Sequence, residues 1–452
     1  MFTIPKSSRR TLIKSSLAAA GSLALRPFGL MPALAQSASD YKALVCVFLL
    51  GGNDSNNTIV PMDDSRYQAY TALRGNLALT GNALTPTVQD VNGAPFAFHS
   101  QLAGLSSLFA SRELSVVANV GPLVQPLTRA EYIAKQVPQP SNLFSHSDQI
   151  SLWQSSIAQG QSPTGWGGRL ADQVLALKMN TGTFPAFIST GGSSLMGTGA
   201  QTTALAVTPG QALTLGGFNN TAPSQARYNA VVNLLNLDSG ISLIQAAKHT
   251  LTNSINDATK LSESLAKAPA LKTVFPNTNI GNQLKQVAQV MQVHADLNMS
   301  RQIFFATIGG FDTHAAQIAT QNNLYAQLGP ALAAFYQATL ELSLGANVTT
   351  FTESDFSRTF NSTSGDGSDH AWGSNQIVMG GAVKGGRIFG QFPQFVLAGP
   401  DDADTRGRWI PTTSVDQMGA TLATWFGVPN SSLATVFPNL KNFPMADLGF
   451  VG

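Results

Sequence analysis

Three short apolar runs that end abruptly in glycine or acidic residues constrain the fold of this chain most strongly. They cover residues 45–50, 303–308 and 346–351. Each run is rich in β-branched or aromatic residues and has the length of a buried strand. Segments with helical apolar spacing separate the runs along the chain. This alternation predicts an α/β protein with a largely parallel central sheet that is flanked by helices on both faces.

Acidic and imidazole side chains follow each of these runs. Ligands and catalytic groups of open α/β sheets collect at the carboxyl ends of strands, so residues of this kind in these places favour a functional role. We therefore interpret the three strand ends as parts of one site. The residues are Asp54 after the first run, Asp312 and His314 after the second, and Glu353, Asp369 and His370 after the third.

The first 35 residues are predicted to be a twin-arginine export signal rather than part of the fold. The pair Arg9 and Arg10 precedes a modestly apolar stretch, residues 17–30, and a small-residue cleavage site lies before Gln36. The apolar stretch is too short to span a bilayer, and Arg26 interrupts it. The predicted partner is the twin-arginine translocation machinery, and the predicted localisation is periplasmic or secreted.

Residues 36–452 are predicted to form a single domain, because neither an internal repeat nor a linker divides them. We expect no stable membrane span in this part of the chain. The signal contains five of the 26 Lys and Arg residues and no acid, which leaves 21 basic and 24 acidic side chains. This slightly negative balance removes compositional support for nucleic-acid binding.

Four of the six histidines have an acid within two residues, which is more than chance predicts. His294 is set aside because it lies in a helical pattern, where such neighbours point to different faces. The other three are His146, His314 and His370, for which helix capping is the competing role. Asp312 and His314 can ligate together, since alternate residues of an extended chain point the same way. Mixed carboxylate and imidazole ligands suit zinc, manganese or iron, whereas carboxylates with water suit magnesium.

A series of motifs along the chain resembles the bacterial domain of unknown function 1501 family. This family is similar in layout to the alkaline phosphatase superfamily, which includes sulfatases. The resemblance implies an alkaline phosphatase-like fold, one or two divalent metal ions (zinc, manganese or magnesium), and a small-molecule or polymer ester as substrate. The motifs, which span nearly all of the chain beyond the signal, are VFLLGGNDSNNTIVP, SHSDQ, GGFDTH, TESDFSRT with SDHAWG, GGAVKGGRIFG and IPTTSVDQMGATLATWFGV.

The same resemblance implies how the metal ligands are assigned. Two registers are open in the third region. In one, Asp369 and His370 form the superfamily's Asp-His pair. In the other, which we favour, Glu353 takes that place and His370 supplies the last imidazole. The implied metal cluster is drawn from Asp54, Asp312, His314, Glu353, Asp369 and His370.

The nucleophile of such an enzyme is expected at a helix N-terminus, where backbone N–H groups stabilise an oxyanion. Ser145 or Ser147 beside His146 fits this position, and Ser55 is the alternative. Capping of helices or turns is the competing role for these serines. Ser145 and His146 are the predicted catalytic pair. Arg358 is a candidate for holding a substrate oxyanion, although structural pairing is the more common role.

Two functions are therefore expected from the sequence. The first is an exported, metal-dependent hydrolase of phosphate or sulfate esters, favoured by the acids and histidines at strand ends. The alternative is a catalytically inactive binding protein of the cell envelope that keeps the alkaline phosphatase-like fold. The altered ligand set and the missing consensus nucleophile favour this second function.

Overall fold

Three parallel strands form the centre of the main sheet, and their carboxyl ends are level with one another. β1 (Lys42–Leu50) lies between β8 (Arg301–Gly309) and β9 (Val348–Ser354). The last residues of β1 and β8, Leu50 and Gly309, are paired, and β9 ends one position earlier in the register with β1. The loops that follow the three predicted strands therefore emerge side by side.

The computed structural model of the protein describes residues 40–211, 221–236 and 242–452. The predicted export signal, residues 1–35, lies outside the described residues. Tyr41–Gly452 forms one compact unit. Within the described ranges, none of the helices combines the length and the apolar character needed to cross a bilayer.

Six further strands complete the nine-stranded sheet. They are β5 (Leu114–Gly121), β6 (Phe187–Ser189), β7 (Leu205–Ala206), β10 (Ser374–Met379), β11 (Ile388–Gly390) and β12 (Thr413–Ser414). The strand order is β11-β5-β10-β9-β1-β8-β6-β7, and β12 pairs with β5. Within the described part of this nine-stranded sheet, β10 alone runs antiparallel to the other strands. The predicted α/β class with a largely parallel sheet is confirmed.

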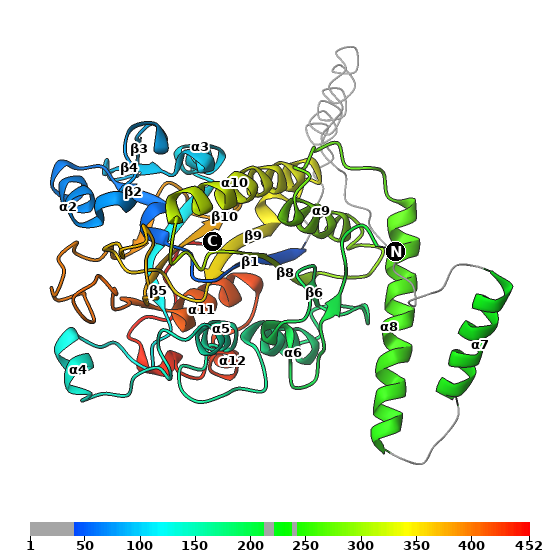
Figure 1. Cartoon of the computed structure of the whole chain (residues 1–452). Coiled ribbons are helices and arrows are strands. Elements are labelled where there is room, and N and C mark those ends of the chain that lie inside the picture. Colours follow the sequence, from blue (N-terminus) through cyan, green and yellow to red (C-terminus); the bar gives the residue numbers. More distant parts are fainter. Residues whose placement is uncertain (1–39, 212–220, 237–241) are drawn as a thin grey trace, which may run out of the picture. The chain divides into compact units, whose positions relative to one another are not determined.

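Helices cover both faces of this sheet (Figure 1). One face carries α3 (Ala103–Ala110), α9 (Asn279–Gln292) and α10 (Gln317–Glu341). The opposite face carries α5 (His146–Ser155), α6 (Trp166–Ala176), α11 (Val415–Phe426) and α12 (Asn430–Val436). The remaining helices are α2 (Asp64–Arg74), α4 (Arg129–Ala134), α7 (Ala222–Asn236) and α8 (Ser242–Lys267).

β1 is apolar without interruption because both of its faces are covered. Successive side chains of a strand point to opposite faces. Val45 and Val47 pack into the core with α9 and α10, whereas Cys46 and Phe48 pack into the core with α6 and α11. A central parallel strand that is buried on both faces loses the usual alternation of apolar and polar residues.

A second, antiparallel sheet of three short strands is not evident in the sequence pattern. Its strands are β2 (Ile59–Pro61), β3 (Val88–Gln89) and β4 (Pro95–Phe98), in the order β2-β4-β3. They contain two to four residues each, too few to establish a period.

The stability of the fold is expected to depend on pH through Asp416, a buried residue of α11. Burial raises its pKa to about 7, and nearby Ser156 and Arg169 offset only part of this effect. Between about pH 4 and pH 7, the folded protein holds a proton that an ordinary carboxyl of the unfolded chain has released. The free energy of unfolding therefore falls as pH rises through this interval.

We expect Asp416→Asn to raise the free energy of unfolding above about pH 7 by roughly 1–4 kcal/mol, and to have little effect below about pH 4. Urea unfolding at both pH values measures the difference. Asp447→Asn is the control, because Asp447 is exposed. A stabilisation by Asp416→Asn that is equal at the two pH values would contradict this account.

Candidate metal centre

Three imidazole rings and one carboxylate converge beyond the carboxyl ends of the central strands. Oδ1 of Asp312 lies 3.0 Å from Nε2 of His314 and 3.3 Å from Nε2 of His146. Nε2 of His370 lies 3.4 Å from the same oxygen. The Nε2 atoms of His314 and His370 are 2.9 Å apart. We call these four residues the histidine cluster.

The cluster is assembled from three parts of the chain. Asp312 and His314 lie on the loop after β8, His146 is the first residue of α5, and His370 lies on the loop between β9 and β10. Close packing of the loop after β1 sets the position of Asp312. Gly51 has a φ of +109°, and a Cβ there would lie 2.5 Å from the Asp312 nitrogen, so glycine is required.

The tautomer of His370 follows from its partner. Its Nδ1 lies 2.6 Å from the carbonyl oxygen of Phe144, which can only accept a hydrogen bond. Nδ1 therefore carries the proton, and Nε2 directs a lone pair toward the cluster. The Phe356 ring stacks on the imidazole with a centroid distance of 4.7 Å and helps to fix its plane.

The other two rings are oriented in the same way by carboxylates. Nδ1 of His146 lies 2.7 Å from Oδ2 of Asp355, and Nδ1 of His314 lies 3.1 Å from Oδ1 of Asp369. Gly51 N–H donates to both oxygens of Asp355, at 3.1 and 3.2 Å, and holds that carboxylate in place. A carboxylate or carbonyl on the far nitrogen is the usual support of a histidine that ligates a metal through Nε2.

Oδ1 of Asp312 therefore lies 3.0–3.4 Å from three imidazole nitrogens, and two of these nitrogens, those of His314 and His370, are 2.9 Å apart. Neutral imidazoles in this arrangement direct lone pairs at each other and at an anionic oxygen, which is unfavourable unless a cation lies among them. Nε2 of His146 is buried and makes no hydrogen bond. In a tetrahedral zinc site with bonds of about 2.0–2.1 Å, the ligand atoms are about 3.3–3.4 Å apart. Ligand atoms of His146, Asp312 and His370 all lie within 4.8 Å of one another, and Nε2 of His314 adjoins two of them, so these residues fit a single metal ion.

The charges around the cluster favour ionised Asp312. Partial burial acts to raise its pKa, but the hydrogen bond and charge of Arg358, together with His146 and His314, hold the pKa below its ordinary value. The hydrogen bond to Asp355 raises the pKa of His146 against the effect of burial.

Arg358 is a structural residue of this site. Its side chain is fully buried, and Nη1 donates to Oδ1 of Asp312 at 3.0 Å and to the carbonyl of Gly51 at 3.1 Å. Nη2 donates to the carbonyl of Ser368 at 2.5 Å. The guanidinium therefore ties together the loops after β1, β8 and β9, and structural pairing is its observed role.

The loop of residues 398–408 supports the histidine cluster from its outer side. Arg406 donates to Asp369 at 2.5 Å, and Arg408 donates to the carbonyl of His370 at 2.8 Å. Buried Asp402 accepts hydrogen bonds from four backbone N–H groups of this loop and fixes its path. Both arginines keep part of their side chains exposed.

The cluster is open to solvent. The side chains of its four members are between 22% and 47% exposed. A purely structural metal site is usually closed by its ligands, whereas a catalytic site leaves access for water or substrate. The exposure therefore favours a site that can accept a substrate.

Asp54 does not join the cluster, which corrects its predicted place as a ligand. Its carboxylate is buried, pairs with Arg74, and also accepts from the side chains of Gln317 and Asn56. These donors occupy the oxygens, so we remove Asp54 from the proposed ligand set.

Glu353 also lies elsewhere, because it belongs to β9 rather than to the loop beyond it. Its carboxyl is directed into the sheet core, where an oxygen lies 3.9 Å from Sγ of Cys46. Burial raises the pKa of Glu353 well above the ordinary range, which favours the neutral acid. Asp355, just past the strand end, is the acid of this region that reaches the site, where it contacts Nδ1 of His146 as a support rather than as a ligand.

The structure does not support Ser145 and His146 as a nucleophile and its base. Ser145 Oγ donates to Asp148 at 2.6 Å, and both ring nitrogens of His146 face carboxylates. Ser55, the alternative, is buried, and its hydroxyl accepts from the Asn375 N–H at 2.8 Å. We therefore assign His146 to the histidine cluster.

The chain is similar to several solved structures of sulfatases and related enzymes. The PsFucS1 sulfatase from Pseudoalteromonas sp. has 10% identity and a TM-score of 0.37, covering 95% of this chain and 73% of that one. The lipoteichoic acid synthase LtaP from Listeria monocytogenes has 7% identity and a TM-score of 0.36, covering 87% and 73%. A 2-O GAG sulfatase has 8% identity and a TM-score of 0.35, covering 88% and 74%.

None of the curated proteins compared with this chain matches it. A family model described as "Protein of unknown function (DUF1501)" matches residues 41–406. Since this match covers most of the chain, the protein belongs to the DUF1501 family, as its motifs predicted.

Proposed function

We propose that the protein is a metal-dependent hydrolase of phosphate or sulfate esters. The observation that carries this proposal is the convergence of three imidazole nitrogens and one carboxylate oxygen at a solvent-accessible edge of the sheet. The ligands would be His146, Asp312, His314 and His370. Three imidazoles favour zinc or manganese over magnesium, which prefers oxygen ligands. A bound divalent ion would supply a Lewis acid for an ester oxygen and lower the pKa of water.

The residues around the cluster have separate roles in this proposal. Asp355 and Asp369 hold the Nδ1 protons of His146 and His314, so their Nε2 atoms stay available as ligands. Arg406 and Arg408 lie at the rim, each paired with a carboxylate, Asp369 or Asp404, and they hold the supporting loop against the cluster.

We also propose that the protein acts outside the cytoplasm, in the periplasm or after secretion. This part rests on the twin-arginine pattern in residues 1–35. Fusion of these residues to a reporter that folds in the cytoplasm tests it. Replacing Arg9 and Arg10 by lysine should stop export, and continued export of that variant would contradict the proposal.

The carboxylates behind the cluster should matter for metal affinity. We expect Asp355→Asn to weaken metal binding about 10–100-fold, because the amide holds the His146 proton less firmly. Competition with a fluorescent chelator measures the affinity. Asp401→Asn is the control, since the one described group that donates to the Asp401 carboxylate is the backbone N–H of Gln394 in its own loop. Unchanged affinity in Asp355→Asn would contradict the orientation assigned to His146.

The activity itself is tested with p-nitrophenyl phosphate and p-nitrophenyl sulfate after loading with zinc or manganese. We expect hydrolysis of at least one ester by the unchanged protein and none above background by Asp312→Asn. Metal binding without hydrolysis of any phosphate or sulfate ester would contradict the hydrolase and favour the binding protein. The Ser145 hydroxyl donates to Asp148 rather than to His146, and this observation keeps the second function under test.

A further inference from the structure

Phe144 has an unusual backbone conformation just before α5. Its φ is +75°, in the left-handed region that bulky residues rarely adopt. Such a conformation costs free energy and persists only where the surrounding structure holds it. The Phe144 carbonyl oxygen lies 2.6 Å from Nδ1 of His370, and α5 begins two residues later with His146. This short stretch therefore supplies one member of the histidine cluster and orients a second.

Arg408 contacts both Phe144 and His370. Its guanidinium carbon lies 4.3 Å from the centroid of the Phe144 ring, within the range of a cation–π contact. Its Nε donates to the carbonyl oxygen of His370 at 2.8 Å. A planar guanidinium can stack through its face and donate from its edge at the same time. Arg408 thus connects the backbone of His370 to the residue whose carbonyl orients the His370 imidazole.

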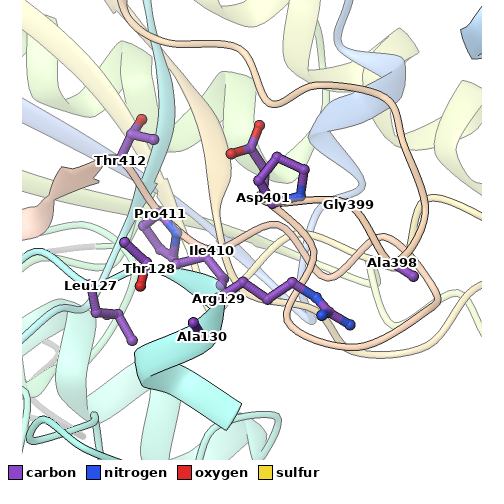
Figure 2. A pocket seen from close by; sticks show the side chains of 11 residues that line it. Leu127, Thr128, Arg129, Ala130, Ala398, Gly399, Asp401, Ile410, Pro411 and Thr412 are labelled. Carbon is purple, nitrogen blue, oxygen red and sulfur yellow. The ribbon is translucent and has the colours of Figure 1, made fainter. Parts of the chain in front are cut away.

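The loop that carries Arg408 is itself fixed on two sides. The buried carboxylate of Asp402 accepts from the backbone N–H of Arg408 at 3.0 Å. Arg129 donates to the carbonyl oxygens of Asp402 and Asp404, at 2.7 and 3.1 Å. Figure 2 shows Arg129 at the start of α4 beside this loop. Arg408 therefore has a defined position from which to hold Phe144.

Apolar packing is the competing explanation for the conformation of Phe144. The residue also packs against a small buried cluster that includes Leu123, Trp372 and Phe443. A ring held by packing alone would stabilise the fold without a specific effect on metal affinity. The two explanations differ in what a glycine at position 144 should do.

We propose that Phe144 and Arg408 are positioning residues of the metal centre. Arg408 holds Phe144 in its left-handed conformation, and the Phe144 carbonyl in turn holds the proton of His370 on Nδ1. Nε2 of His370 then stays available as a ligand. This inference rests on the metal centre of the proposed function, and it does not depend on whether the site hydrolyses an ester.

Zinc affinity, measured by competition with a fluorescent chelator, tests the proposal. Phe144→Ala removes the ring, and alanine still disfavours a left-handed conformation. We expect this variant to bind zinc about 10–100-fold more weakly. Phe144→Gly removes the same ring, but glycine adopts this conformation readily. We expect the glycine variant to bind zinc about fivefold more tightly than the alanine variant.

A second variant tests the part played by Arg408. Arg408→Met removes the guanidinium and keeps an unbranched apolar side chain, and we expect zinc affinity to fall about tenfold. The double variant Phe144→Ala/Arg408→Met should lose less affinity than the product of the two single losses, because both changes break the same contact. Losses that multiply would show that the two residues act independently, and would overturn the proposal.

Arg66 provides a matched control. It also pairs with an acid, Asp63, and its guanidinium carbon lies 5.5 Å from the centroid of the Phe96 ring. Both partners lie outside the histidine cluster and its supporting loop. Arg66→Met should therefore leave zinc affinity unchanged. Circular dichroism establishes that all variants are folded.

The outcomes separate this proposal from the hydrolase. Zinc affinity that falls from the unchanged protein to Phe144→Gly and then to Phe144→Ala, without hydrolysis of any ester, supports the positioning role and contradicts the hydrolase. Ester hydrolysis with equal zinc affinity in Phe144→Ala, Arg408→Met and the unchanged protein contradicts the positioning role alone. A glycine variant that binds zinc no more tightly than the alanine variant would also overturn the proposal, since packing alone predicts that result.

Discussion

Replacing His314 and His370 together by alanine is expected to remove the metal ion and reduce ester hydrolysis to background. A structural zinc site contributes about 10–16 kcal/mol over four ligands, or about 3 kcal/mol for each. Loss of two ligands should therefore weaken binding roughly ten-thousandfold. Elemental mass spectrometry of protein purified without chelator measures the loss, and the p-nitrophenyl esters report activity.

The control for this variant is His249→Ala. His249 is exposed on α8, and its Nδ1 lies 3.1 Å from the Asn253 amide. We expect this change to leave metal content and activity as they are. Circular dichroism establishes that the double variant is folded. Full metal occupancy in the folded double variant would show that the ion is held elsewhere.

Asp54→Ala is expected to destabilise the fold by about 3–5 kcal/mol while leaving the metal in place. The side chains of Asp54 and Arg74 are both 0% exposed and form an ion pair. Removal of the carboxylate leaves the guanidinium buried without its counter-charge, and the amides of Gln317 and Asn56 lose their acceptor. Urea unfolding and elemental mass spectrometry on the same preparation measure both effects.

A surface ion pair provides the matched comparison. Asp63 and Arg66 pair at 2.5 Å near the start of α2, with side chains that are 33% and 37% exposed. Asp63→Ala should cost about 1 kcal/mol, since Asp63 also caps the helix. Metal loss from Asp54→Ala without a fall in stability would restore Asp54 as a ligand and refute its structural role.

The sheet and its functional edge could be predicted because the apolar runs are long and uninterrupted. A strand that is covered on both faces must be apolar throughout, so β1 and β8 are evident in the sequence. Adjacent parallel strands place their carboxyl ends at one edge, and this brought Asp312, His314 and His370 into a single prediction. The short strands of the second sheet give no comparable signal.

The ligand set was less predictable because it depends on where a strand ends and on contacts distant in sequence. β9 continues to Ser354, so Glu353 points into the core and Asp355 is the first acid beyond the sheet. The sequence contains both acids but does not fix that boundary. The pairing of Asp54 with Arg74 could not be predicted either. Nothing in the spacing of these two residues shows whether Asp54 forms an ion pair or binds a metal ion.

The role of His146 also depends on a contact with a residue that is distant in the sequence. A serine and a histidine at a helix start predict a nucleophile and a base as readily as a ligand. The distinction comes from Asp355, which lies 209 residues further along the chain and binds Nδ1 of His146. Ser145, which adjoins His146 in the sequence, is therefore less informative about the role of His146 than Asp355, which is distant in the sequence.

The central claim is that one metal ion is held by the histidine cluster. Anomalous X-ray diffraction from crystals of the zinc- or manganese-loaded protein tests this claim most directly. The account predicts one strong peak at about 2.0–2.2 Å from Oδ1 of Asp312 and from Nε2 of the three histidines. A peak beside Asp54 or Glu353 instead, or the absence of any peak at the histidine cluster, would contradict it.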